Sequence, residues 1–170
     1  FWGEKFASIT MSLENNGQMR LILPDEGVRP EELLCDDEAI RYMISTEGGK
    51  NSKYVIVNLS VPKFDISSTI DLKDGLKKMG ITDAFDSSES DFSPLSESAD
   101  MIVLSKAEQN TRVMIDEEGC KAASLTTMLY AGGAMPDDYV AFTLDRPFLF
   151  EIMSETGLPL FVGIINQPTR

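Results

Sequence analysis

Apolar and polar residues alternate in short stretches along this chain, which is the pattern of half-buried strands. Such alternation runs over residues 8–13, and Asn16-Gly17 then leads into a second apolar stretch over residues 19–23. An Asn-Gly pair between two such stretches is a strong hairpin signal, because both residues tolerate positive φ. The pattern predicts a β-hairpin over residues 6–23.

Three apolar stretches near the C-terminus also have the length of strands, at residues 139–143, 148–154 and 160–165. The last two carry the heaviest run of Phe, Leu and Ile in the chain. We expect them to form the buried centre, against the hairpin of residues 6–23. Further extended segments are predicted from Tyr54 and over residues 102–115.

Helical spacing is confined to short segments. We expect a helical turn over residues 30–34, a helix capped by Asp36 or Asp37, and a two-turn helix that Asp71 caps and Gly80 ends. The predicted fold class is α+β, a mostly antiparallel β barrel or sandwich with a few short helices. We expect no internal repeat, low-complexity tract or second domain.

Composition narrows the function classes. The chain has 170 residues, of which 42% are hydrophobic and 25% charged, as in a soluble globular domain. A net charge of −13 argues against nucleic acid or an anionic membrane surface as partner, since no basic stripe can release counterions. No apolar run approaches the ~18 residues of a membrane span. The start at Phe1-Trp2 rather than Met suggests truncation or processing.

Catalytic and metal chemistry have few candidate residues. The chain has no histidine, which removes Ser/His and Cys/His arrangements and histidine-containing zinc sites, and two cysteines cannot make a four-thiolate site. We expect Cys35 and Cys120 to be free thiols, although they could pair. No spaced carboxylate pair stands out, and the acidic segment 86–91 lacks the pattern of a dedicated calcium loop. We therefore expect no enzyme activity, no metal and no cofactor.

Small side chains dominate the stretch from Gly119 to Asp138, between two strand-like segments. In extended form, its first ten residues after Gly119 would present one face without charge and, until its last member, without bulk. That face would hold Cys120, Ala122, Ser124, Thr126 and Met128. The opposite face would keep the single charge, Lys121, in solvent. Such a segment could slide under a layer of helices as a new strand, whereas the simpler alternative is a surface loop.

The flanks of this stretch resemble the serpin family. Residues 117–124, EEGCKAAS, are similar to the serpin hinge, and residues 142–168 are similar to the family's C-terminal signature around DRPF. Three segments nearer the N-terminus also resemble serpin segments and stand in the order expected for the family: LPDEG at 23–27, VPKFDISSTIDLK at 61–73 and MGITDAF at 79–85. A full serpin is roughly twice as long. The chain therefore resembles the C-terminal part of a single serpin domain, with the N-terminal half absent.

The resemblance implies a suicide inhibitor of serine or cysteine proteases that is secreted or on the cell surface. In that mechanism the target cleaves a reactive loop, here about residues 117–138, and the freed loop inserts into the main sheet as a new strand. The implied hinge consists of Glu117, Glu118, Gly119, Cys120, Lys121, Ala122, Ala123 and Ser124. Since the receiving sheet would come largely from the absent half, the fragment alone should be inactive.

Counting along the family's loop from Glu117 places the scissile bond at Gly133-Ala134. A tiny residue suits the specificity pocket of elastase-like or subtilisin-like proteases and suits trypsin poorly. Because loop length varies in the family, Leu129 and Tyr130 remain alternatives, and these would favour chymotrypsin-like targets.

The resemblance also implies roles for two polar positions and names the expected partners. Lys63 and Glu117 match an ion pair at the top of the family's sheet, and Gln109 stands where many serpins have a histidine beneath the opening sheet. An amide there would form a latch that does not titrate. The implied partners are a target serine protease and the N-terminal half, with self-association through exposed strand edges at 102–115.

The alternative is a serpin-fold protein that binds or carries a partner without inhibiting proteases. Such proteins usually have bulky, charged or proline residues in the hinge. The inserting face formed by Cys120, Ala122 and Ser124 has none of these.

Overall fold

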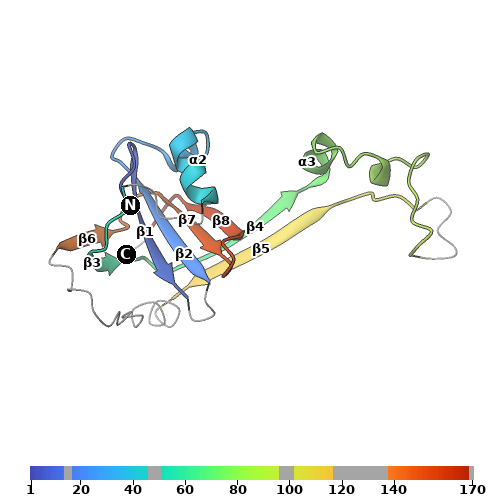
Figure 1. Ribbon diagram of the computed structural model, residues 1–170. Coiled ribbons are helices and arrows are strands. Elements are labelled where there is room, and N and C mark those ends of the chain that lie inside the picture. Colours follow the sequence, from blue (N-terminus) through green and yellow to red (C-terminus); the bar gives the residue numbers. More distant parts are fainter. Residues whose placement is uncertain (14–16, 46–50, 96–101, 117–137, 169–170) are drawn as a thin grey trace. The chain divides into compact units, whose positions relative to one another are not determined.

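The computed structural model describes residues 1–13, 17–45, 51–95, 102–116 and 138–168 (Figure 1). These residues fall into two compact units, Phe1–Phe64 with Ile115–Arg170, and Asp65–Met114. The elements in chain order are β1 (Phe6–Ser12), β2 (Gln18–Pro24), α1 (Pro30–Leu33), α2 (Asp37–Ile44), β3 (Ile56–Ser60), β4 (Phe64–Asp71), α3 (Lys73–Lys78), the 3-10 turn η1 (Asp83–Phe85), β5 (Glu108–Ile115), β6 (Tyr139–Thr143), β7 (Phe148–Met153) and β8 (Pro159–Ile165).

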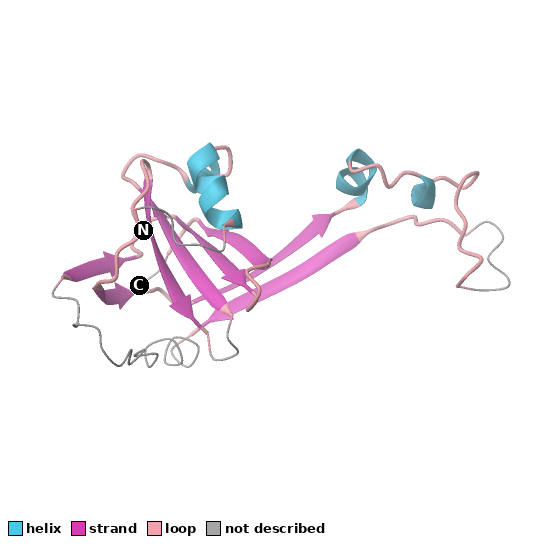
Figure 2. Ribbon diagram, in the orientation of Figure 1, coloured by secondary structure: helices cyan, strands magenta, loops and turns pink. Residues whose placement is uncertain are grey.

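The larger unit is built on a four-stranded antiparallel sheet in the order β1-β2-β7-β8 (Figure 2). The hairpin predicted over residues 6–23 is formed by β1 and β2, and β7 and β8 form the C-terminal pair. The two hairpins join through β2 and β7, where Leu21 lies opposite Phe150 and Ile22 opposite Leu149. The prediction that the C-terminal pair forms the buried centre against the first hairpin is therefore confirmed for β7, which pairs with β2 and is buried, and is wrong for β8, which is exposed over its first four residues.

Both faces of this sheet are buried near β7. On one face, Leu149 joins a cluster with Leu33 of α1 and with Tyr42 and Met43 of α2. On the other face, the ring of Phe64 lies 6.1 Å from that of Phe148 and 5.3 Å from that of Phe150. Burial on both sides explains why β7 begins with three consecutive apolar residues instead of an alternating pattern.

A side-chain cap begins α2, whereas the N-cap residues of α1 and α3 make no such bond. The Oδ1 of Asp36 accepts hydrogen bonds from the backbone N–H groups of Glu38 and Ala39, at 3.0 and 3.1 Å, so Asp36 rather than Asp37 caps α2. The expected cap Asp71 is wrong by one residue, because Leu72 is the N-cap of α3; the Asp71 carboxylate, one residue earlier, accepts from the N–H of Lys73 at 2.8 Å. Gly80 follows α3 with φ of 92° and ends it, as predicted.

A second sheet of the larger unit pairs β3 with β6 in parallel. Its side chains alternate between two environments. Val57, Leu59, Val140 and Phe142 are partly or fully buried on one face, whereas Asn58, Ser60, Tyr139, Ala141 and Thr143 are exposed on the other. The sheet therefore has one core face and one solvent face.

In the smaller unit β4 pairs with β5. Arg112 of β5 makes a two-pronged ion pair with Asp65 of β4, with nitrogen to oxygen distances of 2.8 and 2.6 Å. The pKa of Asp65 is lowered, chiefly by this hydrogen bonding. Thr69 adds a hydroxyl bond to Asn110 at 2.7 Å.

The strand expected over residues 102–115 is shorter, because β5 starts at Glu108. The preceding residues bond elsewhere in their unit: the N–H of Leu104 donates to the carbonyl of Ala84 at 2.9 Å, and the carbonyl of Ile102 accepts from Ser90 Oγ at 2.8 Å. These contacts replace a strand ladder. None of the helices among the described residues has the length and apolar character needed to cross a membrane.

Gly163 offers a test of the packing over β8. It lies opposite Phe150, and a methyl group built on Gly163 would lie 2.5 Å from the Cε1 atom of that buried ring. We expect Gly163→Ala to lower the free energy of unfolding of the whole protein by about 1–3 kcal/mol, through overpacking. Urea denaturation measures this.

The matched control is Gly75→Ala in α3, where an added methyl group meets nothing within 4 Å. Because glycine disfavours helix, this change should raise the free energy of unfolding by up to ~1 kcal/mol. Equal denaturation midpoints for the two variants would contradict the close approach at Gly163.

Candidate functional site

The expected reactive loop falls on residues that the structure leaves undescribed. Residues 117–137 include the whole predicted hinge, the bond Gly133-Ala134 and the alternatives Leu129 and Tyr130, so these assignments stay predictions. The structure does describe both flanks. The segment leaves from β5, which ends at Ile115, and returns at Asp138 into β6. It therefore connects two different sheets.

The returning flank is held by the first residue of β3 and by the segment just before it. The N–H of Ile56 donates to the carbonyl of Asp138 at 2.9 Å, and Lys53 Nζ pairs with the carboxylate of Asp138. Both ion-pair partners are exposed, so the backbone bond and the β3–β6 ladder carry most of the anchoring. The chain that follows the predicted loop is consequently fixed at its first described residue.

Lys63 and Gln109, the two predicted polar positions, are both described in the structure. Lys63 is exposed between β3 and β4, and its expected partner Glu117 lies outside the described residues, so the ion pair stays a prediction. Gln109 is exposed on β5, and its Nε2 lies 3.3 Å from the Oγ1 of Thr111 on the same strand. This contact satisfies one donor locally, and the role of Gln109 as a latch also stays a prediction.

Two motifs that carried the family resemblance meet in the structure. Arg146, from the DRPF segment, donates from Nε to the backbone carbonyl of Pro24 at 3.0 Å. Pro24 ends β2 within LPDEG, and Gly27 of that segment has φ of 86°. The arginine thus joins the end of β2 to the approach to β7.

A buried ion pair at the junction of β2 and β7 was missed in the sequence. Arg20 and Glu151 are directly opposite in the β2–β7 register, are only 3% and 1% exposed, and lie 3.3 Å apart. The Arg20 guanidinium also donates to the carbonyls of Tyr42, Met43 and Ser45, at 2.7, 3.0 and 2.6 Å. It thereby satisfies carbonyls at the C-terminal end of α2.

In the Arg20–Glu151 pair, the effect of burial on the Glu151 carboxylate is larger than the opposing effect of the arginine. Burial raises the pKa of Glu151, and Arg20 opposes the rise through charge and hydrogen bonding. Among the described residues, neither the Glu151 Oε1 nor the Arg20 Nε has a hydrogen-bond partner. One charged residue within each of two apolar stretches, MRLIL and FLFEIM, was the available signal. The sequence could not show that the two charges pair.

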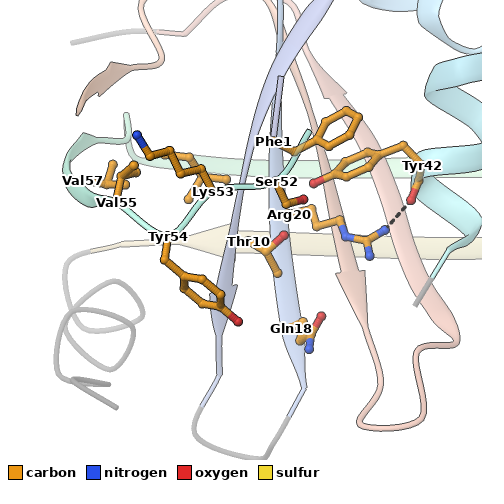
Figure 3. Close-up of a pocket in the computed structure, with 11 residues that line it drawn as sticks. Phe1, Thr10, Gln18, Arg20, Tyr42, Ser52, Lys53, Tyr54, Val55 and Val57 are labelled. Carbon is orange, nitrogen blue, oxygen red and sulfur yellow. Dashed lines mark hydrogen bonds between the residues drawn. The ribbon is translucent and has the colours of Figure 1, made fainter. Parts of the chain in front are cut away.

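A pocket of about 380 Å³ lies between the β1–β2 hairpin and residues 52–57 (Figure 3). Thr10 and Gln18 provide polar groups, and Tyr54 and Val57 provide apolar surface. The Arg20 guanidinium is turned toward the carbonyl of Tyr42 (Figure 3). This lining mixes polar and apolar side chains and offers no converging catalytic groups. The described residues contain no cluster of three or more Cys, Asp or Glu side chains that could bind a metal ion.

The raised pKa of Glu151 predicts a pH dependence. In the folded protein Glu151 keeps its proton to a higher pH than in the unfolded chain, because its folded pKa is raised. As pH rises from about 4.3, the unfolded-state value, through the raised folded pKa, the contribution of Glu151 therefore lowers the free energy of unfolding. Glu151→Gln cannot titrate. The stability of the wild type relative to Glu151→Gln should therefore decrease with rising pH in urea denaturation series.

Asp65→Asn is a control with the opposite sign, because the folded pKa of Asp65 is lowered. The wild type is more stable than this variant at pH values above the unfolded pKa of Asp65, and it loses this advantage as pH falls through the folded pKa. The stability of the wild type relative to Asp65→Asn should therefore increase with rising pH. Parallel pH profiles for both comparisons would show that Glu151 does not have a raised pKa.

Comparisons with known proteins address the whole chain. A family model described as Serpin (serine protease inhibitor) matches residues 2–168. Alpha-1-antiproteinase S of Cavia porcellus is 33% identical over 165 residues, which cover 95% of this chain and 38% of that relative. The chain spans less than two-fifths of the length of the first curated relatives that it matches.

Solved structures agree with this match. The native thermophilic serpin tengpin has a TM-score of 0.70 and 28% identity, over 99% of this chain and 43% of that one. Thyroxine-binding globulin in complex with thyroxine has a TM-score of 0.66 and 27% identity, over 98% of this chain and 42% of that one. The α+β class, with mostly antiparallel strands and few short helices, is confirmed together with the resemblance on which it rested. This chain belongs to the serpin family.

Proposed function

We propose that the whole protein is a serpin-type suicide inhibitor of serine proteases. The target protease cleaves one bond within the loop of residues 117–138, and the freed part of the loop inserts into the main sheet as a new strand. The observation that carries the proposal is the predicted inserting face, where Cys120, Ala122 and Ser124 are small and uncharged. The match to an antiproteinase over 95% of the chain supports it.

The described flanks are compatible with insertion. Among the strands that the structure describes, β5 is paired with β4 alone, so its second edge is available to a further strand. The predicted hinge continues directly from β5, whereas Asp138 is held through Ile56 on the other side of the cut. Cleavage between them would free the hinge side to fold back along β5 while β6 stays in place.

The proposed target class follows from Gly133. Elastase-like and subtilisin-like pockets accept such a small residue, and no basic residue for a trypsin-like pocket occurs between Lys121 and Arg146. Cleavage after Leu129 or Tyr130 would instead indicate a chymotrypsin-like target.

Mixing the whole protein with an elastase-type protease tests function and target together. We expect a one-to-one complex that survives denaturant, with the protease joined through Gly133 in mass spectrometry. Clean cleavage without a stable complex would contradict inhibition, and a complex joined through another residue would contradict the assigned bond alone.

The two faces of the hinge supply a matched pair of variants. Ala122→Arg would place a charge on the inserting face, where burial without a partner is costly, so the protease should cleave the loop and be released. Ala123→Arg would keep its charge in solvent, and we expect at least half of the wild-type complex yield. The measurement is the ratio of complex to cleaved inhibitor. Equal ratios for the two variants would refute an insertion in which residue 122 becomes buried and residue 123 stays in solvent.

The piece of 170 residues should not inhibit by itself, because a complete receiving sheet needs strands beyond those described. We propose that the N-terminal half of the same protein is its natural partner. A second copy could substitute through the edge of β5 that no described strand covers, and light scattering would detect this association. A strictly monomeric piece would exclude it.

A carrier function is the second candidate, favoured by the pocket between the β1–β2 hairpin and residues 52–57. The structural relative solved with thyroxine has a fold similar to this chain. Calorimetric titration of the whole protein with thyroxine would detect one such ligand. Thyroxine binding, together with the absence of any stable protease complex, would favour the carrier function over protease inhibition.

A further inference from the structure

The solvent face of the β3–β6 sheet carries a feature unrelated to protease inhibition. Asn58-Leu59-Ser60 is the only Asn-X-Ser/Thr triplet with a residue other than proline in the middle among the 170 residues. This triplet is the acceptor pattern for N-linked glycosylation. A triplet of this kind is meaningful where the folded protein leaves the asparagine side chain in solvent.

Strand geometry places the two polar residues of the triplet together. Side chains two residues apart in a strand lie on the same face, so Asn58 and Ser60 share one face and Leu59 points to the other. The burial of β3 agrees: Asn58 and Ser60 are exposed, whereas Leu59 is partly buried. The acceptor amide therefore lies in solvent without disturbing the core face.

The neighbouring strand leaves room for a bulky group. Asn58 pairs in register with Ala141 of β6, whose side chain is a single methyl group on the same exposed face. Ser60 pairs with Thr143, which is exposed too. Within the described part of the chain, the Asn58 amide forms no hydrogen bond that a glycan would have to break.

We propose that Asn58 is an N-linked glycosylation site of the whole protein. The donor is an oligosaccharide linked to a lipid through pyrophosphate, in the lumen of a secretory compartment. The Nδ2 atom of Asn58 loses one proton and forms a bond to C1 of the first sugar. The bond from C1 to the pyrophosphate oxygen breaks, and the lipid pyrophosphate leaves. Ser60 provides the hydroxyl by which the transferase recognises the acceptor.

The structure gives this modification a local consequence. On the same face, Tyr139 is 77% exposed and pairs with Ile56, two residues before Asn58 in β3. A glycan on Asn58 covers this ring and the solvent face of β6, immediately after the predicted reactive loop. It hinders a second molecule from stacking on this face, while the core face, with Phe142, is unaffected.

The test uses the whole protein secreted from cultured eukaryotic cells. Trypsin cleaves after Lys53 and Lys63, and the peptide between them contains Asn58 as its single asparagine. Treatment with a glycan-removing amidase should convert that asparagine to aspartate, detected by mass spectrometry, and should shift the protein on a denaturing gel. Protein made in the bacterial cytoplasm should yield the unmodified peptide.

Matched variants keep the test independent of folding effects at position 58. Asn58→Gln and Ser60→Ala should abolish the modification, whereas Ser60→Thr preserves the acceptor pattern and should retain it. Recovery of the wild-type peptide with unmodified asparagine from secreted protein would overturn the proposal. So would a glycan that persists in Ser60→Ala.

Discussion

The pairing of β2 with β7 is the contact on which the larger unit depends. It joins two hairpins into one sheet, and its register places Arg20 opposite Glu151 in the interior. Each charge alone would be costly in such a setting, so the pair holds only because the geometry satisfies most of the arginine's donors. Three of those bonds go to carbonyls at the end of α2, which couples the helix to the sheet.

This coupling explains why a charged residue occupies a core position. An apolar residue at position 20 could pack against the sheet but could not reach the carbonyls of Tyr42 and Met43. The Arg20 guanidinium also lies 4.8 Å from the centre of the Tyr42 ring, a favourable cation–π distance. The same side chain thus fixes the end of α2 and the side chain by which that helix packs on the sheet.

Local patterns predicted much of the fold because most of its elements are set locally. Alternation and Asn-Gly defined the first hairpin, and Asp36 and Gly80 marked helix ends. The start of β5 could not be predicted, since contacts of Leu104 and Ile102 with distant residues decide it. The Arg20–Glu151 pair was missed for the same reason. Motifs identified the family, while the proposed inhibitory residues lie outside the described part of the chain.

The β2–β7 pairing also has a consequence for synthesis. Arg20 and Glu151 are 131 residues apart in the chain, so the sheet cannot form from local contacts. At roughly 5–20 residues per second, β7 leaves the ribosome on the order of ten seconds after β2. During that interval the first hairpin has an unpaired edge, with Leu21 and Ile22 lacking their partners. Chaperone dependence would be concentrated in this window, when a second nascent chain could supply the missing strand.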